Sequence, residues 1–382
     1  MERVMNVRAK KEIEYLQGLE SDVVYRLTKW MHGERSGPAR ISYFPSNTCN
    51  LKCAICWQRK GVYDYVELTS ERQLNLVDEA ASLGVKLVTI GGGGEPLSMW
   101  LTLRDMFHKI KLKGMHGLLF TNGTLITPEI ASDIVGIGWD KVLISMDGLK
   151  NTNDFVRSKG SYEKIIAGLS HILNARGSAK KPVIGVGCVL TRQVISELPD
   201  IIRFLGEKEC DQFNLIRLVV HLPEQRKFAL SNKNIIELPV FLEKAIKMAD
   251  EFGLVTNLKD YLDSELVSNT ERFDKILLSQ RTISGKGSSF WDSICFEPFT
   301  NIVIHADGAV GSCCMSGNNT IANLSARTLE DIWFGEEFTR IRKGIQKRQP
   351  AVYCRICDLN IFQETQRLRA KGDDNNDSFI VL

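Results

Sequence analysis

"SNTCNLKCAICW", residues 46–57, places three cysteines within eight residues of the chain, with the spacing C-x3-C-x2-C. Four thiolates would close a tetrahedral zinc site or occupy every iron of a four-iron cube, whereas Cys49, Cys53 and Cys56 leave one position vacant. The loop follows an apolar strand at 40–44, so we expect it at a carboxyl strand end, where α/β folds place active sites. Spacing alone also allows three unrelated cysteines, or three ligands of a zinc ion whose fourth ligand lies elsewhere.

Length, composition and charge indicate a globular protein. The chain has 382 residues, 43% of them hydrophobic and 25% charged, and a net charge of only +3. That balance predicts neither a nucleic acid nor an anionic membrane as partner. The chain has no apolar run of about 18 residues, and its first residues lack the apolar core of a signal peptide. We therefore predict a cytoplasmic protein.

The cysteines fall into two groups. Eight of the ten lie within 49–56 and 295–357, while Cys188 and Cys210 stand alone. In a reducing compartment, clustered cysteines bind metals or catalyse more often than they form disulfides.

Strand and helix patterns alternate through the first 220 residues. The predicted strands are 40–44, 85–90, 117–124, 141–148, 182–191 and 210–219, and the predicted helices are 69–84, one from about 127, 161–173 and 196–208. This alternation indicates parallel βα units. Six such units predict an α/β fold, a partial (β/α)6 TIM-like barrel.

The opening loop resembles the signature of the radical S-adenosylmethionine (SAM) superfamily, C-x3-C-x-Φ-C. The resemblance implies that Cys49, Cys53 and Cys56 hold a [4Fe–4S] cluster and that the amine and carboxylate of SAM chelate the fourth iron. Position Φ is usually aromatic in that family and is Ile55 here, with Trp57 after it. In that family, the backbone at position Φ commonly contacts the adenine of SAM.

Further SAM contacts are implied by the same resemblance. Four glycines at 91–94 allow close backbone approach and positive φ, although alone they are often a tight turn. Together with Glu95 and Pro96 they match the GGEP motif, whose carboxylate could bind the SAM ammonium. Arg157 suits a carboxylate because its planar fork can bind both oxygens. The residues implied to contact SAM are Ile55, Gly93, Gly94, Glu95, Asn122, Ser145, Asp147 and Arg157.

The second cysteine group follows a predicted helical connection, 225–290, that ends in a flexible link. Residues 301–313 predict a β-hairpin turning at Asp307-Gly308, which would bring Cys295 and Cys313 together. Residues 328–345 predict one amphipathic helix leading to Cys354 and Cys357. Spacing alone fits a zinc ribbon as well as a cluster.

This group is similar to the start of the SPASM motif, the auxiliary-cluster domain of many radical SAM enzymes, through its spacing C-x12-G-x4-C. Because its later part is cut to C-x2-C, it resembles the shorter Twitch form, an α+β domain with one auxiliary [4Fe–4S] cluster. The implied ligands are Cys295, Cys313, Cys354 and Cys357, with Cys314 as an alternative to Cys313. Four thiolates leave no open iron, which favours electron transfer.

The predicted organisation is a helical extension (1–38), the barrel (39–224), the connection (225–290), the auxiliary domain (291–360) and a tail (361–382). The resemblance implies that a flavodoxin or ferredoxin supplies an electron and that SAM yields methionine and a 5′-deoxyadenosyl radical. The resemblance also implies that this radical takes hydrogen from a C–H bond of the substrate. A fully ligated auxiliary cluster favours a two-electron oxidation by a radical SAM oxidoreductase.

Three alternatives stay open for the function. Only about 38 residues precede the first strand, fewer than a peptide-recognition domain needs, which favours a small-molecule or sugar-like substrate. The second possibility is peptide modification by cross-linking or epimerisation, and the third is a non-enzymatic zinc-binding module. Cys188 is either a small core residue or a hydrogen donor to a substrate radical, and Cys210 has the same two interpretations.

Overall fold

The computed structural model describes residues 6–56, 58, 66–263, 295–316 and 320–347, with single positions at 349, 351, 354, 365, 367 and 368. Cys357, residues 264–294 and nearly all of the tail lie outside this part. The described strands form one sheet in the order β10-β9-β8-β1-β2-β3-β4-β5-β6-β7. Among the described helices, none has both the length and the apolar character of a bilayer span.

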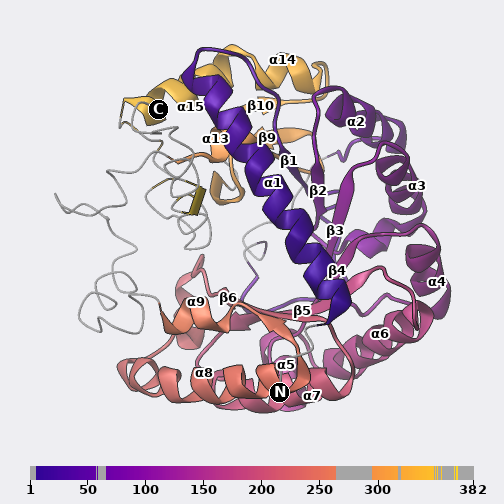
Figure 1. Cartoon of the computed structure of the whole chain (residues 1–382), viewed down its shortest axis with the longest axis vertical. Coiled ribbons are helices and arrows are strands. Elements are labelled where there is room, and N and C mark those ends of the chain that lie inside the picture. Colours follow the sequence, from indigo (N-terminus) through magenta and orange to yellow (C-terminus); the bar gives the residue numbers. More distant parts are fainter. Residues whose placement is uncertain are drawn as a thin grey trace.

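Six parallel strands confirm the predicted alternation. They are β1 (Arg40–Tyr43), β2 (Leu87–Ile90), β3 (His116–Thr121), β4 (Lys141–Ser145), β5 (Val183–Leu190) and β6 (Gln212–Arg217). The helices α2, α3, α4, α6 and α7 line the outer side of this curved sheet (Figure 1). Their bounds are Ser70–Ser82, Trp100–Leu112, Pro128–Gly136, Ser161–Arg176 and Leu198–Glu207.

Local capping explains where several of these helices begin. The side chain of Thr69 accepts a hydrogen bond from the backbone of Arg72 at the start of α2. Thr127 does the same for Ile130, and Pro128 occupies the first turn of α4. Helix α3 and the short helix α5 (Lys150–Val156) are additions to the predicted elements.

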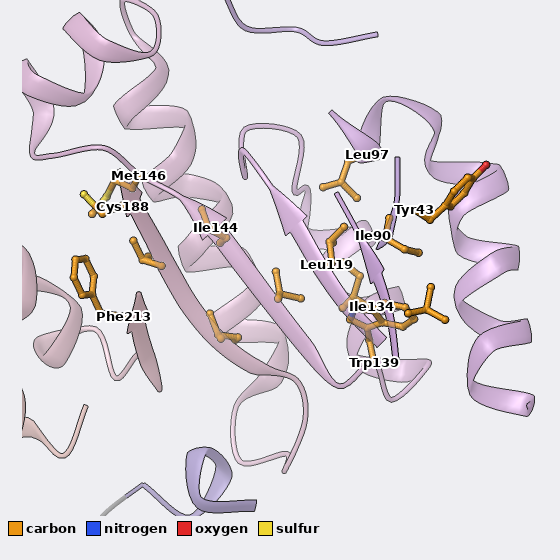
Figure 2. Packing of buried hydrophobic residues seen from close by; sticks show 14 of the residues in the cluster. Tyr43, Ile90, Leu97, Leu119, Ile134, Trp139, Ile144, Met146, Cys188 and Phe213 are labelled. Atoms are coloured by element: carbon orange, nitrogen blue, oxygen red, sulfur yellow. The ribbon is translucent and has the colours of Figure 1, made fainter. Parts of the chain in front are cut away.

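The outer face of the barrel strands is the hydrophobic core. Trp139 is fully buried and stacks on Phe107, with 3.6 Å between ring centroids. Figure 2 shows Trp139 close to Ile134, with Leu119 and Ile144 on neighbouring strands of the same packed layer. Successive strand residues point to opposite faces, so the alternate positions line the inside of the barrel.

Leu143, Gly185 and Gly187 are buried at such inner positions, but several others are only half-buried. The half-buried ones are Ser42, Thr89, Leu118, Phe120, Ser145, Asn214 and Ile216. Their partial exposure shows that the barrel's own side chains do not fill its interior. The inner face is therefore accessible from at least one end of the strands.

Helix α1 (Val7–Met31) covers the amino ends of the barrel strands and crosses the sheet (Figure 1). The hydroxyl of Tyr15 donates to the carbonyl of Lys86, 2.9 Å away, just before β2. Glu12 pairs with His116 at 3.2 Å, at the start of β3, and with Lys141 at 3.7 Å, at the start of β4. These contacts close the amino end, so access to the interior is from the carboxyl ends.

A buried ion pair holds the amino end of β6. Asp211 is fully buried and pairs with Arg176, whose side chain is 3% exposed. The same carboxylate accepts a hydrogen bond from the backbone N–H of Ile184 at 2.8 Å. Both partners are therefore desolvated and depend on each other.

We expect Asp211→Asn to lower the free energy of unfolding by about 3 kcal/mol or more, because Arg176 would be left as a buried charge without its partner. Denaturant unfolding of the variant and the native chain measures this. The matched control is Asp200→Asn, which removes an exposed pair with Arg203 and should cost less than about 1 kcal/mol. A loss for Asp211→Asn as small as that of the control would contradict the assignment.

The C-terminal hairpin is confirmed and extends the barrel sheet. Strands β8 (Asn301–Ile304) and β9 (Ala309–Gly311) pair antiparallel, and Gly308 has φ of 79° in the turn. Strand β8 also pairs with β1 in parallel register, and β10 (Ala322–Asn323) pairs with β9. The short helix α13 (Glu297–Thr300) leads into β8.

The prediction of one helix over 328–345 is wrong. The segment forms α14 (Leu329–Trp333) and α15 (Glu336–Gln346), separated by Gly335 in an extended conformation. Arg327 stabilises the break because it donates both to the carbonyl of Asp331 and to the carboxylate of Glu337.

The connection after β6 begins with the 3-10 turn η4 (Pro223–Phe228), followed by the predicted helix α8 (Asn232–Phe252). The two-residue strand β7 (Val255–Thr256) then pairs with β6, and α9 (Leu258–Leu262) is the last described element before the gap. The predicted helical connection extends to residue 290, and its part from residue 264 onward lies outside the described residues.

Candidate functional site

The cysteine loop and the glycine loop are joined by backbone hydrogen bonds at the carboxyl ends of β1 and β2. The N–H of Gly94 donates to the carbonyl of Ser46 at 2.7 Å, and the N–H of Glu95 donates to the carbonyl of Thr48 at 2.8 Å. The two loops therefore form one unit, in which the segment before Cys49 is fixed by the glycine loop.

Close packing of these loops is what the glycines permit. A Cβ on Gly94 would stand 2.0 Å from the carbonyl oxygen of Thr48, and one on Gly93 would stand 2.7 Å from that of Ser46. Gly93 also has φ of 62°, a conformation that favours glycine. The sequence predicts that the glycines allow a ligand to approach the backbone. The structure shows a second reason for them, since any side chain at Gly93 or Gly94 would clash with the cysteine loop.

We expect Gly94→Ala to push the cysteine loop away from β2, because its Cβ would stand 2.0 Å from a backbone oxygen and the two loops would have to separate. Iron and acid-labile sulfide per chain should then fall by about half after anaerobic reconstitution, as one of two four-iron clusters is lost. Gly136→Ala is the control, since nothing lies within 4 Å of its Cβ position. Native iron content in the Gly94 variant would contradict the expectation.

Glu95 and Asn122 tie three strand ends together. Glu95 is 2% exposed, and its carboxylate accepts hydrogen bonds from Leu97 N, Thr121 Oγ1 and Asn122 N at 3.1, 2.6 and 2.7 Å. Burial raises the pKa of Glu95, and these hydrogen bonds oppose the rise. The side chain of Asn122 donates to Asn50 in the cysteine loop at 2.9 Å. Both residues thus position the loops around the cysteines.

Arg157 brings a positive charge to the cysteine loop. Its Nε lies 2.9 Å from Asp147, which is fully buried and also accepts a hydrogen bond from Val189 N at 2.7 Å. Burial lowers the pKa of Arg157, but Asp147 and the nearby sulfurs of Cys53 and Cys188 raise it above its usual value. Among the described residues, its two Nη groups have no hydrogen-bond partner. They are available to a carboxylate.

The three cysteines lie in the loop as free thiols. Cys49 is exposed, and Cys53 and Cys56 are half-buried. Burial raises the pKa of Cys53 to about 11 and raises that of Cys49, so iron binding must displace protons from both. No three His, Cys, Asp or Glu side chains in the described ranges converge as ligands of one metal ion do. A cube spreads its thiolates over different irons, which a looser arrangement can satisfy.

Four other residues considered in the sequence analysis have distinct surroundings. Ser145 ends β4 and is half-exposed on the inner face. Ile55 packs against an apolar cluster that includes Val156 and Phe228. Cys188 is fully buried in the core, and Figure 2 shows it beside Met146. That position favours its interpretation as a small core residue. Cys210, 5% exposed, belongs to the same core.

A residue of η4 that the sequence analysis did not single out forms hydrogen bonds to the cysteine loop. Gln225 is fully buried, and its side-chain nitrogen donates to the carbonyl of Cys56 at 3.0 Å. Its side-chain oxygen accepts from the N–H groups of His221 and Leu222 at 2.8 and 3.0 Å. Gln225 and Cys56 are far apart in sequence, so no local pattern could have revealed the contact.

His305, in the hairpin turn, also escapes prediction from the sequence. Its ring meets Phe44 edge to face, with centroids 5.1 Å apart, and Phe44 directly precedes the cysteine loop. Burial lowers the pKa of His305, which favours the neutral form of the ring. The C-terminal hairpin thus contributes a polar side chain that packs on Phe44, at the end of β1.

Two of the cysteines implied to bind the auxiliary cluster lie at the open end of the hairpin. Val303 pairs with Gly311, so Cys313, two residues further, lies toward the start of β8. Cys295 precedes α13 on the same side. Cys314 is exposed and begins the turn η5 (Cys314–Ser316), and Cys354 is a single described position. Cys357 lies outside the described residues.

Comparison with known proteins assigns both regions. Residues 43–205 match the radical SAM superfamily, and residues 295–358 match the SPASM iron–sulfur cluster-binding domain. The chain therefore belongs to the radical SAM superfamily and is a radical SAM enzyme with a SPASM domain. Its cofactors are SAM, the SAM-binding [4Fe–4S] cluster and an auxiliary cluster.

Individual relatives span different parts of the chain. Fe-coproporphyrin III synthase of Methanosarcina barkeri is 27% identical over 348 residues, covering 85% of this chain and 82% of the relative. Mycofactocin maturase MftC of Mycolicibacterium smegmatis is 32% identical over 182 residues, 46% of this chain and 44% of the relative.

A solved structure agrees with the fold. SuiB of Streptococcus suis bound to S-adenosylmethionine superimposes with a TM-score of 0.62 at 16% identity, covering 85% of this chain and 72% of SuiB. The predicted α/β barrel with its C-terminal cluster-binding domain is confirmed.

Proposed function

We propose that the protein is an oxidoreductase that removes a hydrogen atom from a C–H bond of a small organic molecule. When bound, SAM and its cluster would supply a 5′-deoxyadenosyl radical, and the auxiliary cluster would accept the second electron of a two-electron oxidation. The observation that carries the proposal is the joining of the cysteine loop to the glycine loop, with Arg157 beside Cys53.

The chain's own residues would hold and orient these groups. Cys49, Cys53 and Cys56 would ligate three irons, and the free Nη groups of Arg157 would bind the SAM carboxylate as a fork. Glu95 would supply negative charge for the ammonium, within a pair of loops already fixed by hydrogen bonds. Cys295, Cys313, Cys354 and Cys357 would hold the auxiliary cluster. A flavodoxin or ferredoxin would supply the electron.

The remaining predicted contacts would complete the SAM site. Ser145, half-exposed at the end of β4, would face the ribose, and the backbone of Ile55 would meet the adenine. Asn122 and Asp147 would act through Asn50 and Arg157, to which they are already bonded.

Two observations favour a small molecule over a peptide. One relative that matches over more than four-fifths of both chains is named Fe-coproporphyrin III synthase, whereas the maturase matches under half of each chain. The half-exposed inner positions Ser42, Thr89, Phe120 and Asn214 are uncharged, and they can accept an organic ring or chain inside the barrel. Peptide modification is the second candidate, supported by the likeness to the maturase.

Hydrogen transfer from a labelled extract tests the proposal even when the substrate is one unidentified molecule among many. The reconstituted enzyme, SAM and dithionite are incubated anaerobically with an extract of the source cells grown in deuterated medium. Mass spectrometry then measures deuterium in the 5′-deoxyadenosine. We expect deuterium transfer that survives digestion of the extract with protease. Transfer abolished by protease would establish the peptide alternative, and 5′-deoxyadenosine without deuterium would contradict C–H abstraction.

A further inference from the structure

Arg342, on α15, is a buried cation enclosed by aromatic rings. The residue is 5% exposed. Its guanidinium carbon lies 4.5, 4.3 and 4.9 Å from the ring centroids of Trp30, Trp333 and Phe338. The three rings come from α1, α14 and α15, so the cage excludes water from three directions.

The polar contacts of Arg342 leave its charge uncompensated. Nε donates to the carbonyl of Pro298 at 2.9 Å, and Nη1 donates to the carbonyl of Trp333 at 2.8 Å. Nη2 is buried and, among the described residues, has no hydrogen-bond partner. Within the described ranges, no carboxylate forms an ion pair with Arg342, and the charge that acts on it is the cation of Arg35.

The guanidinium nevertheless stays protonated. Burial, and then the charge of Arg35, lower the pKa of Arg342 to about 9, which is still above physiological pH. Burying a charge without a counter-charge is unfavourable, and contacts with aromatic faces offset only part of that cost. The fold therefore keeps a full positive charge at a position where a negative partner would be stabilising.

The position of Arg342 points to that partner. Pro298, which accepts its hydrogen bond, is three residues after Cys295, in α13. Cys295 packs against an apolar cluster that also includes Ile345, the next inward-facing residue of α15. Helix α15 then leads toward Cys354. Arg342 thus bonds to the segment that carries one predicted ligand and lies on the helix that leads to another.

We infer that Arg342 is an electrostatic tuning residue, which raises the reduction potential of the auxiliary cluster by stabilising its reduced form. Four thiolates give a [4Fe–4S] cluster a net negative charge that grows by one when it is reduced, and a nearby fixed cation favours that state. The aromatic cage strengthens the interaction because it lowers the local dielectric. A higher potential would favour electron uptake from a substrate radical. The inference depends on the auxiliary cluster but not on the substrate.

A redox titration of the reconstituted full chain, followed by EPR with SAM present, tests the inference. SAM alters the EPR signal of the cluster that binds it, so the signals of the SAM-binding cluster and the auxiliary cluster can be told apart. We expect Arg342→Met, close to arginine in volume, to lower the midpoint potential of the auxiliary cluster, and Arg342→Lys to restore most of the shift. Arg340→Gln, an exposed charge on the same helix, is the control and should leave the potential nearly unchanged. Equal potentials in Arg342→Met and the native chain would overturn the inference.

Unfolding experiments give a second readout if the potential of a variant cannot be measured. If Arg342 and the cluster are coupled, Arg342→Met should cost more stability in the cluster-loaded chain than in the cluster-free chain. Equal costs would assign Arg342 a packing role only. A native chain that binds no auxiliary cluster would instead refute the cluster assignment, so the two failures are distinguishable.

Discussion

Replacing Cys49, Cys53 and Cys56 together with Ala should lower the iron content of the reconstituted chain from about eight to about four atoms and abolish SAM cleavage. The three thiols lie in one loop whose backbone is fixed by the glycine loop and by Gln225, so the loop offers three ligands together and not one alone. Iron, acid-labile sulfide and zinc per chain measure the result.

Cys210→Ala is the matched control for the triple variant. Cys210 is buried at the amino end of β6, far from the cysteine loop, and its loss should leave about eight irons. A triple variant that keeps native iron content would contradict the assignment of the first cluster. The native chain could instead bind four irons and one zinc, with the triple variant keeping only the zinc. That result would mean that the chain has no auxiliary cluster, and the case for oxidation would be lost. Zinc alone, in the native chain, would support the non-enzymatic zinc-binding alternative.

Arg157→Met should weaken SAM binding by about ten- to a hundredfold while leaving the first cluster assembled. A charge-assisted hydrogen bond is worth about 1.5–3 kcal/mol, and Arg157, whose charge acts on Cys53, has two Nη groups that can each donate to a carboxylate. Binding isotherms of SAM to the reconstituted protein give the affinity, and EPR reports whether the cluster is intact.

A second variant separates binding from stability at this site. Arg157→Met alone leaves Asp147 as a buried, unpaired carboxylate, which should cost about 3 kcal/mol in unfolding free energy. Adding Asp147→Asn removes that charge and should recover much of the stability, while SAM binding stays weak. Recovery of SAM affinity together with stability would mean that Arg157 only pairs with Asp147.

The sequence predicted the barrel well because its signals are local. Apolar strand patterns such as 85–90 and caps such as Thr69 depend on a few neighbouring residues. The helix pair α14–α15 was mispredicted because the break at Gly335 depends on Arg327 reaching across it. The pairing of β8 with β1 joins segments about 260 residues apart, which no local pattern encodes.

The same distinction between local signals and contacts of distant segments applies to the candidate site. The cysteines, the glycine loop and Arg157 follow strand ends, so a family pattern can identify them. The residues that fix them in place, such as Gln225 and Asn50, act through contacts with distant segments. The structure also shows that Gly94 is required by the approach of Thr48, a constraint that only the packed loops reveal.

The most direct test of the central claim is the release of 5′-deoxyadenosine from SAM by the reduced enzyme. Native protein and the Cys49/Cys53/Cys56 triple variant are incubated anaerobically with SAM and dithionite, and the nucleoside is quantified per chain. We predict release by the native protein and none by the variant. No release by the native, cluster-loaded protein, or equal release by both, would contradict the claim that these three thiols hold the cluster at which SAM is cleaved.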